Sequence, residues 1–188
     1  KYAPDIICLQ ELKAPIESVP TNKFIELGYK YLVIRGQKGY NGVAIISRIP
    51  IVEVGSHDYC LKGDARHVCA RLPNGVEIQT FYIPAGGDLA DRELNKKFEH
   101  KLDFLDEMAV NFNKNQLSKT ILVGDLNIAP LENDVWNHKQ LNNVVSHTPV
   151  EIEALKRVIS TGDFVDITRK DLPEGLLYSW WSYRSPNW

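Results

Sequence analysis

The residues best suited to chemistry lie in one stretch, residues 120–130. An apolar run leads into Gly124, and Asp125 and Asn127 follow two positions apart. The run predicts a buried central strand, because a strand covered on both faces shows no polar alternation. Side chains two positions apart share one side of an extended chain, so an acid and an amide would meet where the strand ends. Active sites of layered α/β proteins commonly lie at such ends, although both residues are also ordinary turn formers before Pro130.

A second stretch, residues 5–11, has the same design, since an apolar run again ends in a carboxylate, that of Glu11. If the two strands lie close together, Glu11 and Asp125 converge, and Asn127 adds an amide oxygen. Such a set, without Cys or His, suits a hard cation, and magnesium prefers few protein oxygens and keeps waters for a substrate's phosphates. The alternative is that each acid is a solvated strand end.

Three aromatic side chains are candidates for contacts with a phosphate-containing substrate. Tyr82 closes another strand, where its phenol could donate to a phosphate oxygen. Tyr40 lies at a glycine-flanked tip, as do side chains that stack on or wedge into nucleic acid. Trp180 is a candidate substrate wall. Core, rim or loop packing is the alternative for each of them. Candidate phosphate contacts, for most of which a solvated surface role is the alternative, are Lys13, Lys62, Arg66, Arg71, Arg92 and Arg184.

Composition is that of a globular protein. The 188 residues are 44% hydrophobic and 24% charged, which allows one domain with a real core. The net charge of -2 argues against nucleic-acid binding driven by bulk charge. Three cysteines without metal-ligand spacing predict reduced packing residues and a cytosolic compartment. No apolar run reaches the length of a membrane span. The chain starts without Met and ends rich in aromatics, so we expect an interior piece of a longer domain.

Periodicity predicts strands alternating with a few helices. The stripe of the main helix, within residues 88–113, comprises Leu94, Phe98, Leu102, Leu105, Met108 and Phe112. Further helices are predicted at 21–27 and 150–159. Further strands are predicted at 29–34, 42–47, 51–54, 67–72, 76–82, 164–168 and 178–183. Asn74-Gly75 predicts a hairpin turn between 67–72 and 76–82. This order favours two packed sheets with helices outside.

Together these segments resemble a known family. Their order is that of the exonuclease III-type apurinic/apyrimidinic endonucleases, of the endonuclease/exonuclease/phosphatase superfamily. The segments are Leu9-Gln-Glu-Leu-Lys13, Gly39-Tyr-Asn-Gly42, Tyr82-Ile-Pro-Ala-Gly86, Gly124-Asp-Leu-Asn-Ile-Ala-Pro130 and Ser179-Trp-Trp-Ser-Tyr-Arg184. The Gln-Glu and Gly-Asp-x-Asn motifs specify only the superfamily, which includes inositol phosphatases and sphingomyelinases. The tyrosine-proline loop and the Trp-Trp-x-Tyr-Arg segment narrow the resemblance to the DNA-repair branch.

The resemblance implies catalytic and metal-binding roles. Glu11 would hold the catalytic magnesium, with Asp125 and Asn127 as further metal ligands. Asp125 would activate the attacking water or manage the leaving-group proton, and Asn127 would orient the nucleophile or substrate. Tyr82 would bind the scissile phosphate. Ala85 departs from members with an amide at that position, which puts one phosphate or active-site contact in doubt.

The resemblance also implies DNA contacts. Tyr40 would contact DNA beside the lesion, and Trp180 would line the pocket for the abasic sugar. Apart from the resemblance, Lys13, Asn41, Arg66 and Arg184 are also expected to contact DNA. The family starts with a strand ending in Asn and finishes with an Arg-x-Asp strand and a Ser-Asp-His motif, which are expected before Lys1 and after Trp188.

The fold class expected is therefore α/β (α+β). It is a DNase I-like four-layer sandwich of two mixed sheets flanked by helices, in a single domain over 1–188 that is incomplete at both ends. The expected function is a Mg²⁺-dependent phosphodiesterase, with Mn²⁺ as an alternative ion. It would cleave double-stranded DNA 5′ to abasic sites and remove nucleotides or blocks from 3′ ends, as a cytoplasmic monomer without membrane contact. The alternatives are a phosphoesterase for inositol phosphates or phospholipids, and an inactive DNA-binding fragment.

Overall fold

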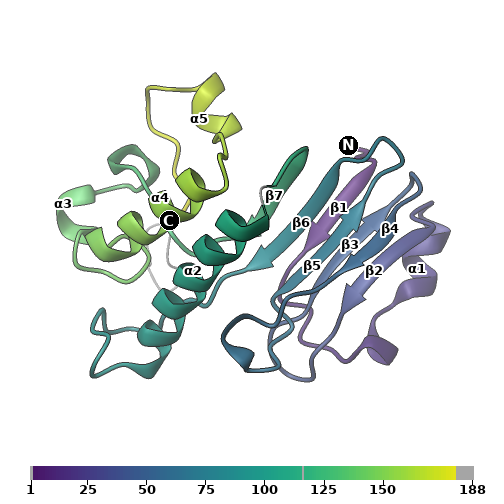
Figure 1. Cartoon of the computed structure of the whole chain (residues 1–188), viewed down its shortest axis with the longest axis horizontal. Helices are drawn as coiled ribbons and strands as arrows, with labels where there is room; N and C mark the ends of the chain where they lie inside the picture. The colour runs from purple at the N-terminus through teal and green to yellow at the C-terminus, as the bar shows by residue number, and fades with distance from the viewer. Residues whose placement is uncertain (1, 116, 181–188) are drawn as a thin grey trace. The chain divides into compact units, whose positions relative to one another are not determined.

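The computed structural model describes residues 2–115 and 117–180, which divide into two compact units (Figure 1). The first, the sheet unit, comprises residues up to Tyr82 together with Ser118–Leu126. The second, the helical unit, comprises Ile83–Leu117 and the residues from Asn127 onward. The prediction of one domain over 1–188 stays a prediction, and each unit is described by itself.

The first sheet of the sheet unit is antiparallel. Its order is β1 (Ile6–Leu9), β3 (Val43–Ser47) and β2 (Tyr31–Arg35). The central strand β3 is buried along its whole length because both of its faces are covered. Ile45 packs towards the second sheet, whereas Ile46 packs with Phe24 of the short helix α1 (Thr21–Glu26). A 3-10 turn, η1 (Ile16–Ser18), leads into α1.

The second sheet is mixed. Its order is β4 (Val52–Gly55), β5 (His67–Arg71), β6 (Glu77–Tyr82) and β7 (Thr120–Asp125), with a 3-10 turn, η2 (Tyr59–Leu61), before β5. The first three strands are antiparallel, and β5 and β6 form the predicted hairpin. Strand β7 runs parallel to β6, so Tyr82 and Asp125 are register partners. Val68 and Ile78 of this sheet share a core with Val33 and Ile45 of the first, which confirms two packed sheets.

The prediction that the two acid-bearing strands are buried is wrong for the described residues. Strands β1 and β7 are the outer strands of their sheets, and neither contains a fully buried residue. Ile121, for example, is 43% exposed. A run of apolar residues indicates that both faces of a strand can be buried. It does not determine whether the strand is central or at an edge of its sheet, because that depends on pairing between distant segments.

The helical unit is built on two helices that pack together, α2 (Lys96–Asn115) and α4 (Pro149–Thr161). The predicted stripe from Phe98 to Phe112 is buried. Leu94 is an error in that stripe, since it lies before the helix and is 77% exposed. The Asp91 carboxylate accepts from the Leu94 N–H and holds a turn there. Helix α4 begins with a Thr148–Glu151 capping box, and Gly162 follows its last residue.

The remaining segments of the helical unit are short. They are η3 (Glu132–Asp134), α3 (His138–Leu141) and α5 (Ile167–Asp171). The predicted strand at 164–168 is wrong, because Asp166 accepts from the Arg169 N–H and caps α5 instead. Residues 178–180 form no strand, and 181–183 lie outside the described residues. Within the described ranges, no helix combines the length and the apolar character needed to cross a membrane. The fold class is confirmed as α/β, with two packed sheets and helices.

Candidate active site

The turn that follows β1 carries Glu11 in a constrained backbone conformation. Glu11 and Lys13 have φ angles of 55° and 53°, in the left-handed region that residues other than glycine rarely adopt. The Gln10 amide donates to the Thr80 hydroxyl at 2.9 Å, which ties this turn to β6. The contact with β6 therefore helps to fix the turn.

A second loop, residues 37–42, locks the Glu11 turn from the other side. The Lys13 N–H donates to the Asn41 carbonyl at 2.8 Å, and the Gly39 N–H donates to the Lys13 carbonyl at 3.0 Å. Asn41 is only 8% exposed, and its amide donates to the Gln37 side chain at 2.9 Å. Tyr40, in contrast, is 73% exposed at the tip. The loop thus presents Tyr40 to solvent while Asn41 holds the loop's shape.

Glu11 lies between a phenol and an ammonium group. The Tyr82 hydroxyl donates to one Glu11 oxygen, and Lys13 Nζ lies 2.9 Å from the other. The hydrogen bond from Tyr82 and then the one from Lys13 lower the pKa of Glu11 below its ordinary value. Glu11 therefore presents an ionised carboxylate, which is the form that binds a cation.

Tyr82 is held in its neutral form. Burial, followed by the hydrogen bond to Glu11, raises the pKa of Tyr82 above its ordinary value. Arg66 donates to the Tyr82 carbonyl at 3.1 Å, and its guanidinium lies 4.9 Å from the centre of the Tyr82 ring. Arg66 also pairs with Asp64 at 3.0 Å, and its side chain is only 14% exposed. Tyr82 can thus act as a hydrogen-bond donor at neutral pH.

Asp125 ends β7 beside Tyr82. The two residues are partners in the parallel ladder, and the negative charge of Asp125 contributes to the raised pKa of Tyr82. Gly124 makes this arrangement possible, because a Cβ at that position would lie 2.0 Å from the Phe81 carbonyl oxygen. Glu11, Tyr82 and Asp125 are therefore brought together at the strand ends of the sheet unit.

The donor chemistry of this cluster fits a hard divalent cation. Both carboxylates supply oxygen ligands, and the Glu11 carboxylate is held ionised. Among the described residues, no three acidic, His or Cys side chains converge into a metal-binding group. Any cation held by Glu11 and Asp125 would keep waters or substrate oxygens as its other ligands, as magnesium commonly does.

Asn127 belongs to the helical unit and does not continue β7. The strand ends at Asp125, and Asn127 has a φ of 51°, so the expectation of an extended backbone from Asp125 through Asn127 is wrong. The side-chain amide of Asn127 donates to the Ile83 carbonyl at 3.0 Å, and the backbone carbonyl of Asn127 accepts from Lys101 Nζ at 2.7 Å. The Asn127 loop is therefore held at both its side chain and its backbone.

The C-terminal candidate residues are described only in part. Trp180 lies in the helical unit, half-buried and outside any helix or strand. The preceding Ser179 N–H donates to the Asp134 carbonyl at 2.9 Å. Arg184 lies outside the described residues.

Two side chains that position these loops were missed from the sequence. Lys101 is fully buried, although Lys is usually exposed. The available signal was its spacing, because it lies three residues after Phe98 and four before Leu105, on the apolar stripe of α2. Gln37 gave no such signal, since a half-buried amide in a glycine-rich loop has no characteristic pattern.

Comparison with known proteins gives a consistent result. The whole chain, residues 1–188, matches the Endonuclease/Exonuclease/phosphatase family. It is 32% identical to an exodeoxyribonuclease of Bacillus subtilis, with 96% of this chain and 70% of the relative covered. It is 29% identical to the DNA repair nuclease APEX1 of Danio rerio, with 97% and 59% covered. The chain thus spans between about three fifths and seven tenths of these relatives' length.

Solved structures agree with this match. An AP endonuclease from Archaeoglobus fulgidus superposes with a TM-score of 0.86 at 30% identity, covering 98% of this chain and 70% of that protein. A 3′ phosphatase, NExo, from Neisseria, bound to a product DNA hairpin, gives a TM-score of 0.83 at 29% identity, with 97% and 70% covered. Both neighbours have the fold predicted from the sequence.

Proposed function

This chain belongs to the endonuclease/exonuclease/phosphatase family, and we propose that it is part of a DNA-repair phosphodiesterase. The enzyme hydrolyses the DNA backbone 5′ to abasic sites and removes nucleotides or blocks from 3′ ends. The observation that carries the proposal is the cluster of Glu11, Tyr82 and Asp125 at the strand ends of the sheet unit. The relatives support it, because they are named as an exodeoxyribonuclease, a DNA repair nuclease and an AP endonuclease.

In the proposed reaction, water attacks the phosphorus atom and the P–O bond to the leaving oxygen breaks. When substrate binds, the single hydroxyl proton of Tyr82 turns from Glu11 to a non-bridging phosphate oxygen, where negative charge grows in the transition state. The raised pKa of Tyr82 supports this role, since a phenolate could not donate. Asp125, which is exposed at the strand end, accepts the proton of the attacking water or returns one to the leaving oxygen. Asn127 orients the nucleophile or substrate.

The family is metal-dependent, and we assign the ion as Mg²⁺, with Mn²⁺ as a substitute. Glu11 and Asp125 would hold it, with Asn127 as a further candidate ligand. When bound, a divalent cation neutralises charge that develops on the phosphate. The Lys13 ammonium lies 2.9 Å from one Glu11 oxygen, so in this proposal Lys13 is the basic group next to the oxygens that would hold the ion.

Double-stranded DNA with an abasic site or a 3′ end is the proposed partner. With a net charge of -2, local contacts must supply the affinity. Tyr40 is exposed at the tip of its loop and available to pack against DNA. Lys13 and Arg66 are the basic groups next to Glu11 and Tyr82, whereas Trp180 and Arg184 complete the proposed contacts. None of the three cysteines forms a disulfide in the described part of the chain, which supports a cytoplasmic location, and a monomer accounts for the proposed activity.

The test uses the full-length protein that contains this chain and a labelled duplex that carries one tetrahydrofuran abasic analogue, with magnesium present. We expect cleavage 5′ to the analogue, and a loss of about 100-fold or more for Glu11→Gln and for Asp125→Asn. Glu53→Gln is the matched control, because it removes an exposed acid of the same unit on β4. Equal cleavage by the wild type, Glu11→Gln and Asp125→Asn would refute the proposed function. Turnover of inositol phosphates or phospholipids without competition from duplex DNA would place the chain in another branch of the family.

A further inference from the structure

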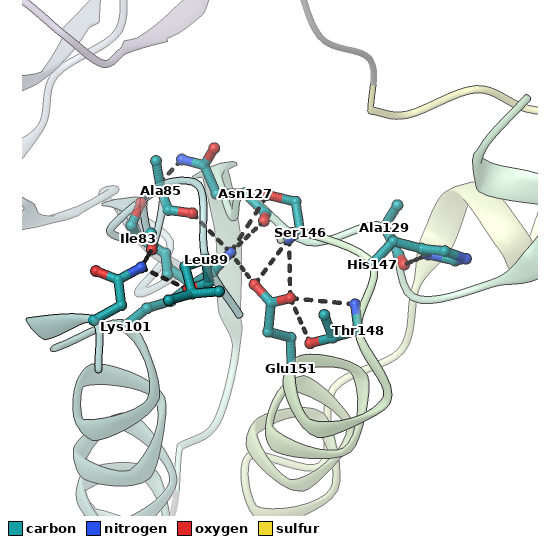
Figure 2. Close-up of polar contacts among 12 residues, drawn as sticks. Ile83, Ala85, Leu89, Lys101, Asn127, Ala129, Ser146, His147, Thr148 and Glu151 are labelled. Carbon is teal, nitrogen blue, oxygen red and sulfur yellow. Dashed lines mark hydrogen bonds and ion pairs between the residues drawn. The ribbon is translucent and has the colours of Figure 1, made fainter. Parts of the chain in front are cut away.

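We propose that the buried ion pair between Lys101 and Glu151 is a positioning device for the Asn127 loop and for the loop that follows β6. This inference rests on the proposed function only in naming Asn127 as a catalytic side chain. Figure 2 shows Lys101 and Glu151 meeting between α2 and α4, with contacts to both loops. Lys101 is a positioning residue here, since it acts through the backbone of other residues.

Lys101 joins three separate segments through one ammonium group. Its Nζ donates to the Ala85 carbonyl at 3.2 Å, to the Asn127 carbonyl at 2.7 Å and to the Ser146 hydroxyl at 3.4 Å. It also pairs with the Glu151 carboxylate. The Lys101 stem packs closely against Gly86, because a Cβ added to that glycine would lie 3.0 Å from Lys101 Cδ. The loop after β6, the Asn127 loop and the Ser146 segment are thus fastened to one atom.

The charge of Lys101 is fully compensated inside the protein. Both side chains of the pair have no exposed surface, and a buried charge is strongly unfavourable unless it is paired and hydrogen-bonded. Glu151 also accepts from the Ser146 N–H at 2.9 and 3.0 Å, from the Thr148 N–H at 3.2 Å and from the Thr148 hydroxyl at 2.6 Å. A carboxylate satisfied on all sides has one orientation, so it fixes the position of Lys101 Nζ.

The residues that this network holds are strained ones. Asn127 and Ser146 have φ angles of 51° and 83°, and Lys101 Nζ contacts both. Such conformations persist only where surrounding contacts over-determine them. The Ala129 N–H donates to the Ser146 carbonyl at 2.9 Å, which adds a second link between the same two segments. Without the ammonium group, the Asn127 carbonyl would lose a 2.7 Å hydrogen bond from a charged donor.

The test replaces the pair by Lys101→Met together with Glu151→Met. Apolar residues of similar size often substitute for a buried ion pair without loss of stability. We expect hydrogen exchange at the Ala129 amide to become about tenfold faster or more, because opening of the loop exposes it. Exchange in β3 should stay unchanged. The kcat on the abasic duplex should fall about 100-fold, with KM changed less than about twofold.

Two further variants make the result decisive. Lys156→Met with Glu153→Met removes an exposed ion pair of α4 and should leave both readouts at the wild-type value. Lys101→Gln with Glu151→Gln keeps a hydrogen-bond donor, so its kcat should be about tenfold higher than that of the methionine pair. If the methionine pair does not fold, the glutamine pair is compared with wild type by the same exchange measurement.

Unchanged exchange at Ala129 in a folded variant would overturn the inference, as would equal kcat values for the methionine and glutamine pairs. If the full-length wild-type protein does not cleave abasic DNA, the proposed function fails, whereas the exchange measurement still decides whether Lys101 positions the loop. The two failures are therefore distinguishable.

Discussion

The Tyr82→Phe substitution separates the chemistry of the candidate site from its architecture. It removes one hydroxyl and keeps the ring, which contacts Arg66 and belongs to the core between the sheets. A hydrogen bond to a charged acceptor contributes about 1.5–3 kcal/mol. The Glu11 side chain is 45% exposed, so solvent screening reduces that value to about 1 kcal/mol. A domain of this size has about 5–15 kcal/mol of stability, and the variant should therefore remain folded.

The effect on catalysis should be larger than the effect on stability. Removing one donor aimed at a developing negative charge lowers kcat by about 10²–10³, or roughly 3–4 kcal/mol. The assay measures single-turnover cleavage of the abasic duplex in magnesium, alongside thermal unfolding of the same preparations. In the variant, the pKa of Glu11 should also rise towards its ordinary value, since the hydrogen bond from Tyr82 is the main cause of its lowering.

Tyr29→Phe is a closely matched control. Tyr29 is also buried in the sheet unit, its hydroxyl donates to the Pro4 carbonyl at 2.9 Å, and Arg48 lies over its ring at 4.7 Å. We expect both variants to lose similar stability and only Tyr82→Phe to lose turnover. Wild-type turnover in Tyr82→Phe would refute the assigned role. An equal loss of turnover in both variants would show that the hydroxyls matter only for folding.

Two further predictions concern stability. Gly124→Ala should destabilise the fold by about 3–5 kcal/mol, since its Cβ would lie 2.0 Å from the Phe81 carbonyl oxygen and its φ is 135°. The control is Gly75→Ala, whose Cβ would have no atom within 4 Å, and urea unfolding midpoints measure both variants. Equal losses of stability would contradict the collision argument. Burial lowers the pKa of His67 from 6.5 to about 4. Between these two pKa values the unfolded chain binds a proton at His67 that the folded chain does not bind. The contribution of neutral His67 to folding stability is therefore complete above pH 6.5 and declines as the pH falls towards 4. The loss of stability should reach about 3 kcal/mol. Urea unfolding at pH 7.5 and 4.5 should show that the free energy of unfolding changes less with pH in His67→Gln than in the wild type. The same change with pH in both proteins would contradict the assignment.

The sequence was informative where chemistry follows directly after a strand. The positions of Glu11 and Asp125 at strand ends could be predicted because each comes just after an apolar run, and that of Tyr82 because it closes a hairpin strand. The register that makes Tyr82 and Asp125 partners could not be predicted, since it depends on pairing between segments that are far apart in the chain. The outer positions of β1 and β7 were missed for the same reason.

The residues that support the site were harder to predict than the site residues themselves. Gln37 acts by accepting hydrogen bonds from Asn41 and from the backbone N–H of Ala65, and nothing in a loop sequence indicates such partners. Lys101 was detectable in principle as a charge on an apolar stripe, but its partner Glu151 resembled an ordinary capping residue. Arg66 was predicted as a DNA contact, and its hydrogen bond to the Tyr82 carbonyl gives it a structural task as well.

Backbone strain links these supporting contacts to the proposed chemistry. Among the described residues, nine other than glycine have a positive φ, and four of them are predicted site residues: Glu11, Lys13, Asn41 and Asn127. Each such conformation is unfavourable by about 1–3 kcal/mol, so neighbouring contacts must offset it. Backbone hydrogen bonds between the 11–13 turn and the 37–42 loop do so in the sheet unit, and the Lys101 ammonium does so at Asn127. Side chains held in this way would need little reorganisation in the proposed reaction, which is the condition under which fixed donors stabilise a transition state most effectively.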